Sequence, residues 1–184
     1  MQSDSSRDRG RCGILPHRQR SSDTRVDWAA GLSFIVMSHG LNQSEMLRLL
    51  GYNIAQAAIP AFKLFDTLIG LPLGLRQVEY SILTLVESNE KATHKRLSAA
   101  LGVAAPNLTI VLDRLEQRQL VKRTRSQHDG RVQHIELTQR GRTLHGKAKQ
   151  IADTMEDELL SHFSAGERAM LFELLQKLAA QRRP

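Results

Sequence analysis

The sequence predicts a mainly α-helical protein with one small β-hairpin, and three observations lead to this fold class. Apolar residues recur at intervals of three and four along most of the chain after residue 45, as on one face of a helix. The interval changes to two in residues 120–125 and 131–137, which a turn-forming segment separates. Aromatic residues make up only 4% of the chain. The core must therefore be mostly aliphatic, which suits helices packed on helices better than packed sheets.

The charge of the chain indicates the kind of partner that it binds. Its 184 residues carry a formal net charge of +7, and the isoelectric point is near 10.1. This balance favours a polyanion, with nucleic acid before an anionic membrane. The uninterrupted apolar stretches are too short to span a bilayer, and the first residues lack the order of a signal peptide. We therefore expect a cytoplasmic protein that does not contact a membrane.

Residues 1–40 differ from the rest of the chain. They begin with a segment rich in Ser, Arg and Gly and show no sustained period, which predicts a flexible tail before a domain at residues 41–182. Met37 lies just before the periodic pattern, so an alternative hypothesis is that the native chain starts there. The single cysteine, Cys12, falls in this tail and excludes an intramolecular disulfide.

The first two predicted helical segments cover residues 45–69 and 76–88. Both have apolar residues at helical spacing. Pro60 lies inside the first segment and should kink or divide it, because proline removes a backbone donor and clashes with the preceding turn.

Two shorter helices follow, in residues 93–103 and 104–121. Thr93 is placed to cap the first of them, and Gly102 to end it. Pro106 falls in the first turn of the second helix, where a missing backbone donor costs little.

The predicted hairpin is followed by two long helical stretches. Ser164 and Glu167 have the spacing of a capping box at the start of the last helix. Two short helices, a tight turn and a hairpin make a winged helix-turn-helix, here at residues 76–138. The terminal segments 45–69 and 139–182 carry more apolar surface than this small lobe can cover, so we expect them to pair with a second copy of the chain.

The sequence around the hairpin resembles a known family. In "DGRVQHIELTQRG", the Asp, Arg, Leu-Thr and Gly are spaced as in the wing signature of the MarR family of bacterial transcription regulators. The matching residues are Asp129, Arg131, Leu137, Thr138 and Gly141. The stretch "LSAALGVAAPNLTIVLDRLEQRQLVKR" is also similar to that family's helix-turn-helix. The resemblance runs from about Leu47 to the carboxyl end and implies a homodimer that binds double-stranded DNA.

The predicted fold suggests which side chains contact DNA. A helix in the major groove reads bases with residues near its amino end, and the preceding helix crosses the phosphates. Asn107 is placed to pair with adenine, or it only caps its own helix. His94 is read as an exposed polar residue. The candidate DNA-binding residues are Thr93, Lys95, Arg96, Pro106, Asn107, Thr109, Arg114, Arg123, Arg125 and Arg131.

The tip of the predicted hairpin contains an acidic residue, a glycine and a basic residue in succession. The resemblance implies that Asp113 pairs with Arg131 and fixes the base of the wing, while Asp129 and Gly130 shape its turn. The alternative is that Arg131 itself enters the electronegative minor groove. Arg123 and Arg125 contact phosphates in either case.

Three features depart from the family's pattern. Ala104 and Ala105 stand where a hydroxyl residue usually caps the recognition helix, which weakens the cap by about 1 kcal/mol. Gln119 replaces the usual Gly before Leu120, and Gln127 replaces a Pro that is common in the wing. These departures leave the predicted DNA contacts in place but put the wing geometry in doubt.

The resemblance also implies an effector, because members of the family often bind small aromatic acids or phenols between the dimer helices and the DNA-binding lobe. The residues that would line this cleft are Tyr52, Phe62, Phe65 and Tyr80. At helical spacing the same residues also suit an ordinary core. Some relatives sense peroxide through a cysteine, but Cys12 lies outside the matched helices.

No catalytic or metal site emerges from the sequence. His134, Glu136, His145 and His162 do not have the spacing of a compact metal site, and no nucleophile–base pair can be assembled. We therefore expect neither cofactor nor enzymatic activity. The predicted function is sequence-specific regulation of transcription by a repressor on a pseudo-palindromic operator, released by a small ligand. The alternative is an architectural protein that binds DNA regardless of sequence.

Overall fold

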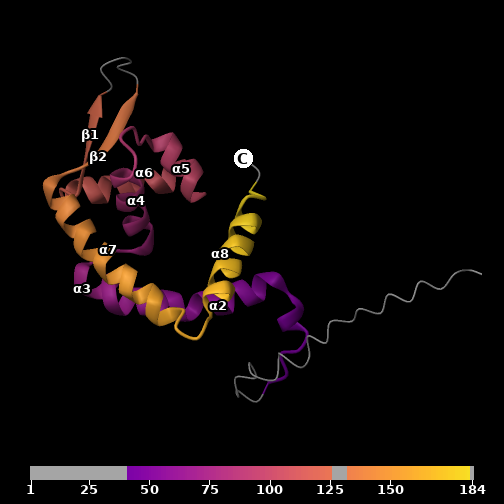
Figure 1. The fold of residues 1–184 in the computed structure, drawn as a ribbon. Helices are drawn as coiled ribbons and strands as arrows, with labels where there is room; N and C mark the ends of the chain where they lie inside the picture. The colour runs from indigo at the N-terminus through magenta and orange to yellow at the C-terminus, as the bar shows by residue number, and fades with distance from the viewer. Residues whose placement is uncertain (1–40, 126–131, 183–184) are drawn as a thin grey trace, which may run out of the picture. The chain divides into compact units, whose positions relative to one another are not determined.

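The computed structural model describes residues 41–125 and 132–182, and its main compact unit begins at Ser44. Its elements, drawn in Figure 1, are η1 (Met46–Arg48), α2 (Leu50–Phe65), η2 (Asp66–Gly70), α3 (Leu71–Leu73), α4 (Gln77–Glu87), α5 (His94–Leu101), α6 (Ala105–Gln117), β1 (Val121–Arg125), β2 (Gln133–Leu137), α7 (Gln139–Leu159) and α8 (Ala165–Ala179). The predicted fold class, mainly helical with one hairpin in a winged helix-turn-helix, is confirmed.

The first long helix does not divide at Pro60. α2 runs through the proline to Phe65, and the chain then makes a π-helical turn, η2, before α3 ends at the left-handed Gly74. An interior proline removes one backbone hydrogen bond and clashes with the preceding turn, at a cost of about 3 kcal/mol, so the rest of the helix has to offset this cost. The helical run continues through η2 to Leu73, so the division that the sequence suggested as one outcome at Pro60 does not occur.

The run Leu50–Leu73 is long and apolar enough to cross a membrane by length and composition, although polar residues interrupt it, and the expectation drawn from uninterrupted apolar stretches did not consider such a run. Within the most apolar 18 residues of this run, 11% is buried inside the protein. One such helix is weak evidence for a membrane, because an exposed apolar face is equally what a helix needs for contact with another protein surface.

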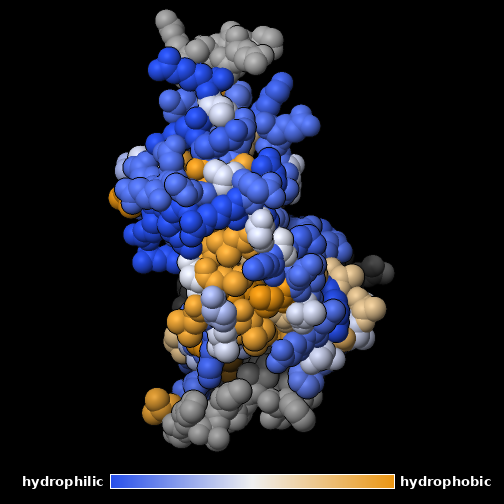
Figure 2. Space-filling view, turned by 90° about the vertical axis from the view of Figure 1, so that its left-hand side faces the viewer, coloured by the Kyte–Doolittle hydropathy of each residue, from blue (hydrophilic) through white to orange (hydrophobic). Residues whose placement is uncertain are grey.

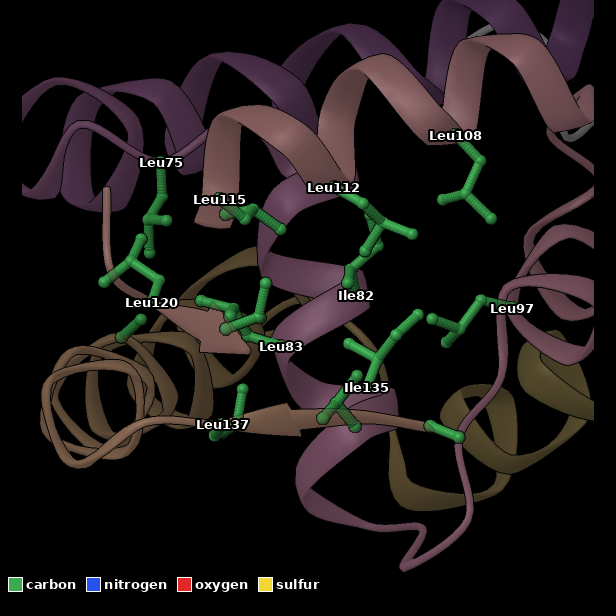
Figure 3. Close-up of a cluster of buried hydrophobic side chains, with 14 of the residues drawn as sticks. Leu75, Ile82, Leu83, Leu97, Leu108, Leu112, Leu115, Leu120, Ile135 and Leu137 are labelled. Atoms are coloured by element: carbon green, nitrogen blue, oxygen red, sulfur yellow. The ribbon is translucent and has the colours of Figure 1, made fainter. Parts of the chain in front are cut away.

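Aliphatic side chains from α4, α6 and β2 form the centre of the winged helix-turn-helix lobe. Figure 3 shows Leu112 of α6 next to Ile82 of α4, with Leu83 between Leu115 and Leu137. All of these side chains are buried. Burying one such side chain contributes about 1.5 to 3 kcal/mol relative to leaving it exposed. This core therefore fixes the inner face of α6 and leaves its other face exposed.

The wing is an antiparallel hairpin whose register runs from Val121 opposite Leu137 to Arg125 opposite Gln133. A third segment joins it, because the amide of Ile135 donates to the carbonyl of Ala92 over 2.8 Å. The hairpin is thus attached to the residues that precede α5.

Helix ends agree with the sequence at four places. The Thr93 side chain accepts from the amide of Arg96, and Gly102 ends α5 with a left-handed backbone. Ser164 and Glu167 form the predicted capping box. Thr138 caps α7 by accepting from the amide of Gly141 over 3.0 Å, which agrees with the prediction that this threonine starts a helix.

Gly141 is required by a close approach of two backbones. A Cβ atom at this position would lie 2.0 Å from the carbonyl oxygen of Leu120. We expect Gly141→Ala to lower the free energy of unfolding by about 1 to 3 kcal/mol, since the contact cannot be relieved without moving the wing or α7. Gly146→Ala in the same helix is the control. Nothing lies within 4 Å of a Cβ atom added at Gly146, so we expect Gly146→Ala to raise the free energy of unfolding by up to about 1 kcal/mol. Urea denaturation measures both, and equal effects would contradict the steric explanation.

Gln119 has the only positive φ, 57°, among non-glycine residues that the structure describes. A side chain costs about 1 to 2 kcal/mol in this left-handed conformation. We therefore expect Gln119→Gly to raise the free energy of unfolding by about 0.5 to 1 kcal/mol. The control Gln117→Gly, in the last turn of α6, should lower it by a similar amount. The midpoint of thermal unfolding should rise for the first variant and fall for the second.

Candidate nucleic-acid interface

The amino end of α6 presents accessible side chains. Pro106, Asn107 and Thr109 are exposed on this helix, while Leu108 on the opposite face is buried. The N-cap is Ala104, which makes no side-chain capping bond, so Asn107 lies within the helix and is not its cap. Its amide is therefore accessible to a ligand on this face.

Thr109 also connects the two helices of the helix-turn-helix. Its hydroxyl oxygen lies 3.0 Å from Nε2 of His94, and it donates to the carbonyl of Ala105 over 3.1 Å. His94, which the sequence suggested as a plain surface residue, thus links α5 to α6. In the same helix, Arg96 donates to the carbonyl of Lys91, and Lys95 is exposed.

A buried carboxylate joins the start of α4 to the end of α6. Glu79 is 1% exposed, and its Oε2 accepts from the backbone amide of Arg76 over 2.9 Å and from Nη1 of Arg118 over 3.2 Å. Its Oε1 lies 3.9 Å from Nη1 of Arg114. The structure therefore places Arg114, a candidate DNA-binding residue, in an internal ion pair. Sequence reasoning missed Glu79, although a Glu at the third position of a helix is a recognisable capping signal.

The base of the wing is held by a second set of ion pairs. Nη2 of Arg123 lies 2.5 Å from Oδ1 of Asp113, and its Nη1 lies 3.1 Å from Oε2 of Glu116. Asp113 thus contacts the wing, with Arg123 as its partner. The predicted partner, Arg131, lies outside the described residues, as do Asp129 and Gly130 at the turn.

The outer strand positions of the wing are also charged. Arg125 ends β1 on an exposed position. Glu136 on β2 accepts from Thr124 over 2.7 Å and pairs with Lys122 over 3.1 Å. The Thr124 hydrogen bond, with that of Lys122, lowers the pKa of the Glu136 carboxyl. These contacts keep the carboxylate charged and occupied within the hairpin.

Of the four residues predicted to line an effector cleft, the structure brings two into contact and places the other two elsewhere. Phe65 and Tyr80 lie side by side with ring centroids 5.8 Å apart, and Tyr80 lies 6.0 Å from the ring of His145. Phe62 is exposed and lines a different groove, and Tyr52 lies near the start of α2. His145 is buried and its Nε2 lies 3.2 Å from the hydroxyl of Thr84. This histidine was considered from the sequence only as a metal ligand.

The junction of Tyr80, Thr84 and His145 makes stability depend on pH. Burial, with a smaller contribution from Lys149, lowers the pKa of the His145 imidazole below its ordinary value of 6.5, and Glu87 opposes this shift. The folded chain then holds neutral imidazole while the unfolded chain takes up a proton. Stability from this source is complete above pH 6.5 and is lost as pH falls below it.

We expect His145→Gln, which cannot titrate, to reduce the loss of unfolding free energy between pH 7 and pH 5. His162→Gln, at an exposed histidine just after α7, is the matched control. Urea titrations at several pH values measure the slope. An unchanged slope in His145→Gln, or an equal change in both variants, would refute the burial explanation.

Comparisons with known proteins agree with this geometry. Residues 75–132 match the model of the MarR family. The chain is 32% identical to the transcriptional repressor CouR, solved bound to a 23-mer DNA duplex, with a TM-score of 0.70 over 76% of this chain and 98% of that one. It is 26% identical to a mutant of MarR from E. coli complexed with operator DNA, with a TM-score of 0.66 over 74% of this chain and 96% of that one.

Two curated relatives extend the comparison. One is a putative transcriptional regulatory protein for the hcr operon of Thauera aromatica, 25% identical over 132 residues, which are 72% of this chain and 80% of the relative. The other is an uncharacterized HTH-type transcriptional regulator of Bacillus subtilis, 27% identical over 105 residues. That match covers 57% of this chain and 64% of the relative, just under two thirds of its length. The chain belongs to the MarR family of winged helix-turn-helix transcription regulators.

Proposed function

We propose that this protein is a homodimeric repressor that binds a pseudo-palindromic operator in the cytoplasm and catalyses no reaction. One observation carries the proposal: the amino end of α6 is exposed, while its inner face is fixed by buried leucines and by the Glu79–Arg118 pair. A helix held in this way can enter a major groove without first becoming ordered, so less binding free energy is lost. The DNA-bound relatives support this proposal.

The terminal helices support the homodimer. No residue of α8 is buried. Met170, Leu174 and Leu178 are four positions apart and so share one side of the helix, and they are 62%, 56% and 39% exposed. Contiguous apolar surface of this kind is typical of a protein interface. A second copy would cover it symmetrically and place two α6 helices in major grooves about one helical turn apart.

A small aromatic effector is the proposed signal for release. A related repressor, CouR, has been solved bound to p-coumaroyl-CoA, and the chain covers 99% of it at 31% identity. In this protein Phe65, Tyr80 and His145 meet where α2, α4 and α7 join. A ligand there would contact both the terminal helices and the DNA-facing lobe. It could therefore change the spacing of the two recognition helices, on which tight operator binding depends.

Selection of bound DNA from a random pool tests the proposal. We expect a two-fold symmetric sequence that the protein binds roughly a thousandfold more tightly than scrambled DNA at physiological salt. Binding that stays uniform across sequences would reject specific regulation and leave an architectural DNA-binding protein. Salt dependence alone would not separate the two, because both neutralise phosphates.

Asn107 and Lys95 should affect DNA binding in different ways. Asn107→Ala removes a base-reading amide, so we expect a loss of about 1 to 3 kcal/mol at one base-pair position and relaxed preference there. Lys95→Ala should weaken binding equally to all sequences and reduce the salt slope by about 1, as expected for a phosphate contact. Fluorescence anisotropy with the selected operator and single-position variants measures both. Loss of base preference in Lys95→Ala, or none in Asn107→Ala, would contradict these assignments.

A further inference from the structure

Ile110 is the one exposed large apolar side chain in the winged helix-turn-helix lobe. Its exposed fraction is 59%, and no other large apolar side chain among the described residues of this lobe, 76–125 and 132–138, is exposed. The other exposed side chains of this kind lie in residues 41–71 and 163–178, for which a second copy of the chain is the proposed cover. On the face that Figure 2 shows, the surface around the wing is hydrophilic, and apolar surface gathers lower down. The proposed dimer therefore does not account for the exposure of Ile110.

The position of Ile110 in α6 turns its side chain away from the core. Successive residues of a helix are rotated by about 100°, so Leu108 and Leu112, each two positions away, point in nearly the opposite direction. Both leucines are buried. Asn107, three positions before Ile110, lies on the same side of the helix and is exposed. Ile110 thus belongs to the surface of α6 that is proposed to enter the major groove.

The hydroxyl of Thr109, next to Ile110, is already engaged within the protein. It donates its hydrogen to the carbonyl of Ala105, and its oxygen lies 3.0 Å from Nε2 of His94. A hydroxyl has a single hydrogen, so Thr109 has no donor left for a base while these contacts hold. Beside Ile110, hydrogen bonds to a base are therefore left to the amide of Asn107, and Ile110 itself can add only an apolar contact.

We propose that Ile110 is a specificity-determining residue that contacts the C5-methyl group of a thymine in the operator. In the major groove this methyl group distinguishes thymine from the other bases, and apolar side chains contact it. The contact removes two apolar surfaces from water, whereas a cytosine would set its polar amino group beside the isoleucine. The assignment rests on the proposed function, because it requires α6 to lie in the groove.

The spacing along α6 predicts where this thymine lies. Asn107 and Ile110 are three residues apart, which is about 4.5 Å along a helix axis, and successive base pairs are about 3.4 Å apart. The two side chains therefore reach positions one or two base pairs apart. We expect each half-site to contain a thymine, on either strand, within two base pairs of the adenine that Asn107 is proposed to read.

Replacing single thymines of the selected operator by deoxyuridine tests the contact, because this change removes only the methyl group. Fluorescence anisotropy with the full chain measures the affinity for each operator. At one thymine of each half-site, we expect wild-type protein to lose roughly fourfold in affinity per methyl group, as the burial of one such group implies. Ile110→Ala should bind the thymine and deoxyuridine operators equally. Ile110→Val, which keeps a branched apolar side chain, should still prefer thymine.

Gln117→Ala is the matched control, because Gln117 is also exposed on α6 but lies at its last residue. It should keep the wild-type loss at the same thymine. The proposal is overturned if no thymine responds in wild type, if the response persists in Ile110→Ala, or if Gln117→Ala abolishes it too. These results all require a selected operator. If the random pool yields no preferred sequence, the proposed function itself has failed, and the assignment of Ile110 fails with it.

Discussion

The buried carboxylate of Glu79 is the constraint on which the DNA-facing lobe depends. A carboxylate removed from water is stable only when donors and cations replace its hydration, and loss of one partner from such a pair costs about 3 to 5 kcal/mol. Here the replacements are the amide of Arg76 at the start of α4 and the side chain of Arg118 at the end of α6. The pair sets the distance between these two ends, and the leucine core fills the space between the helices.

Most of the fold could be predicted because it follows from local sequence. Thr93 and Gly102 bound a short helix, and each acts through its own backbone or the next turn. The hairpin could be predicted because side chains alternate wherever one face of a strand is buried, as Ile135 and Leu137 are. Gln119, noted as a departure from the family's glycine, has the left-handed backbone that explains why glycine is usual there.

The remaining features depend on residues far apart in the chain, which periodicity does not connect. Arg118 and Glu79 are 39 positions apart, and Thr84 and His145 are 61 apart. The proximity of Arg114 to Glu79 and the burial of His145 could therefore not be anticipated, and a DNA contact of Arg114 stays a prediction. The exposure of Pro106, Asn107 and Thr109 could be predicted from helix periodicity, whereas the partners of such side chains within the protein could not.

The contact of Gly141 with the carbonyl of Leu120 has a mechanical consequence. Thr138 also bonds this carbonyl through its amide, over 3.1 Å, and donates to the carbonyl of Gln119. Two backbones in direct contact, joined by these hydrogen bonds, have little room to change their mutual angle, so we expect α7 and the hairpin to turn together. A rotation of α7 would therefore carry the hairpin with it, and the displacement along the strands would grow with distance from this contact. Gly74, with its left-handed backbone between α3 and α4, lies outside this contact and has the conformational freedom to absorb such a rotation.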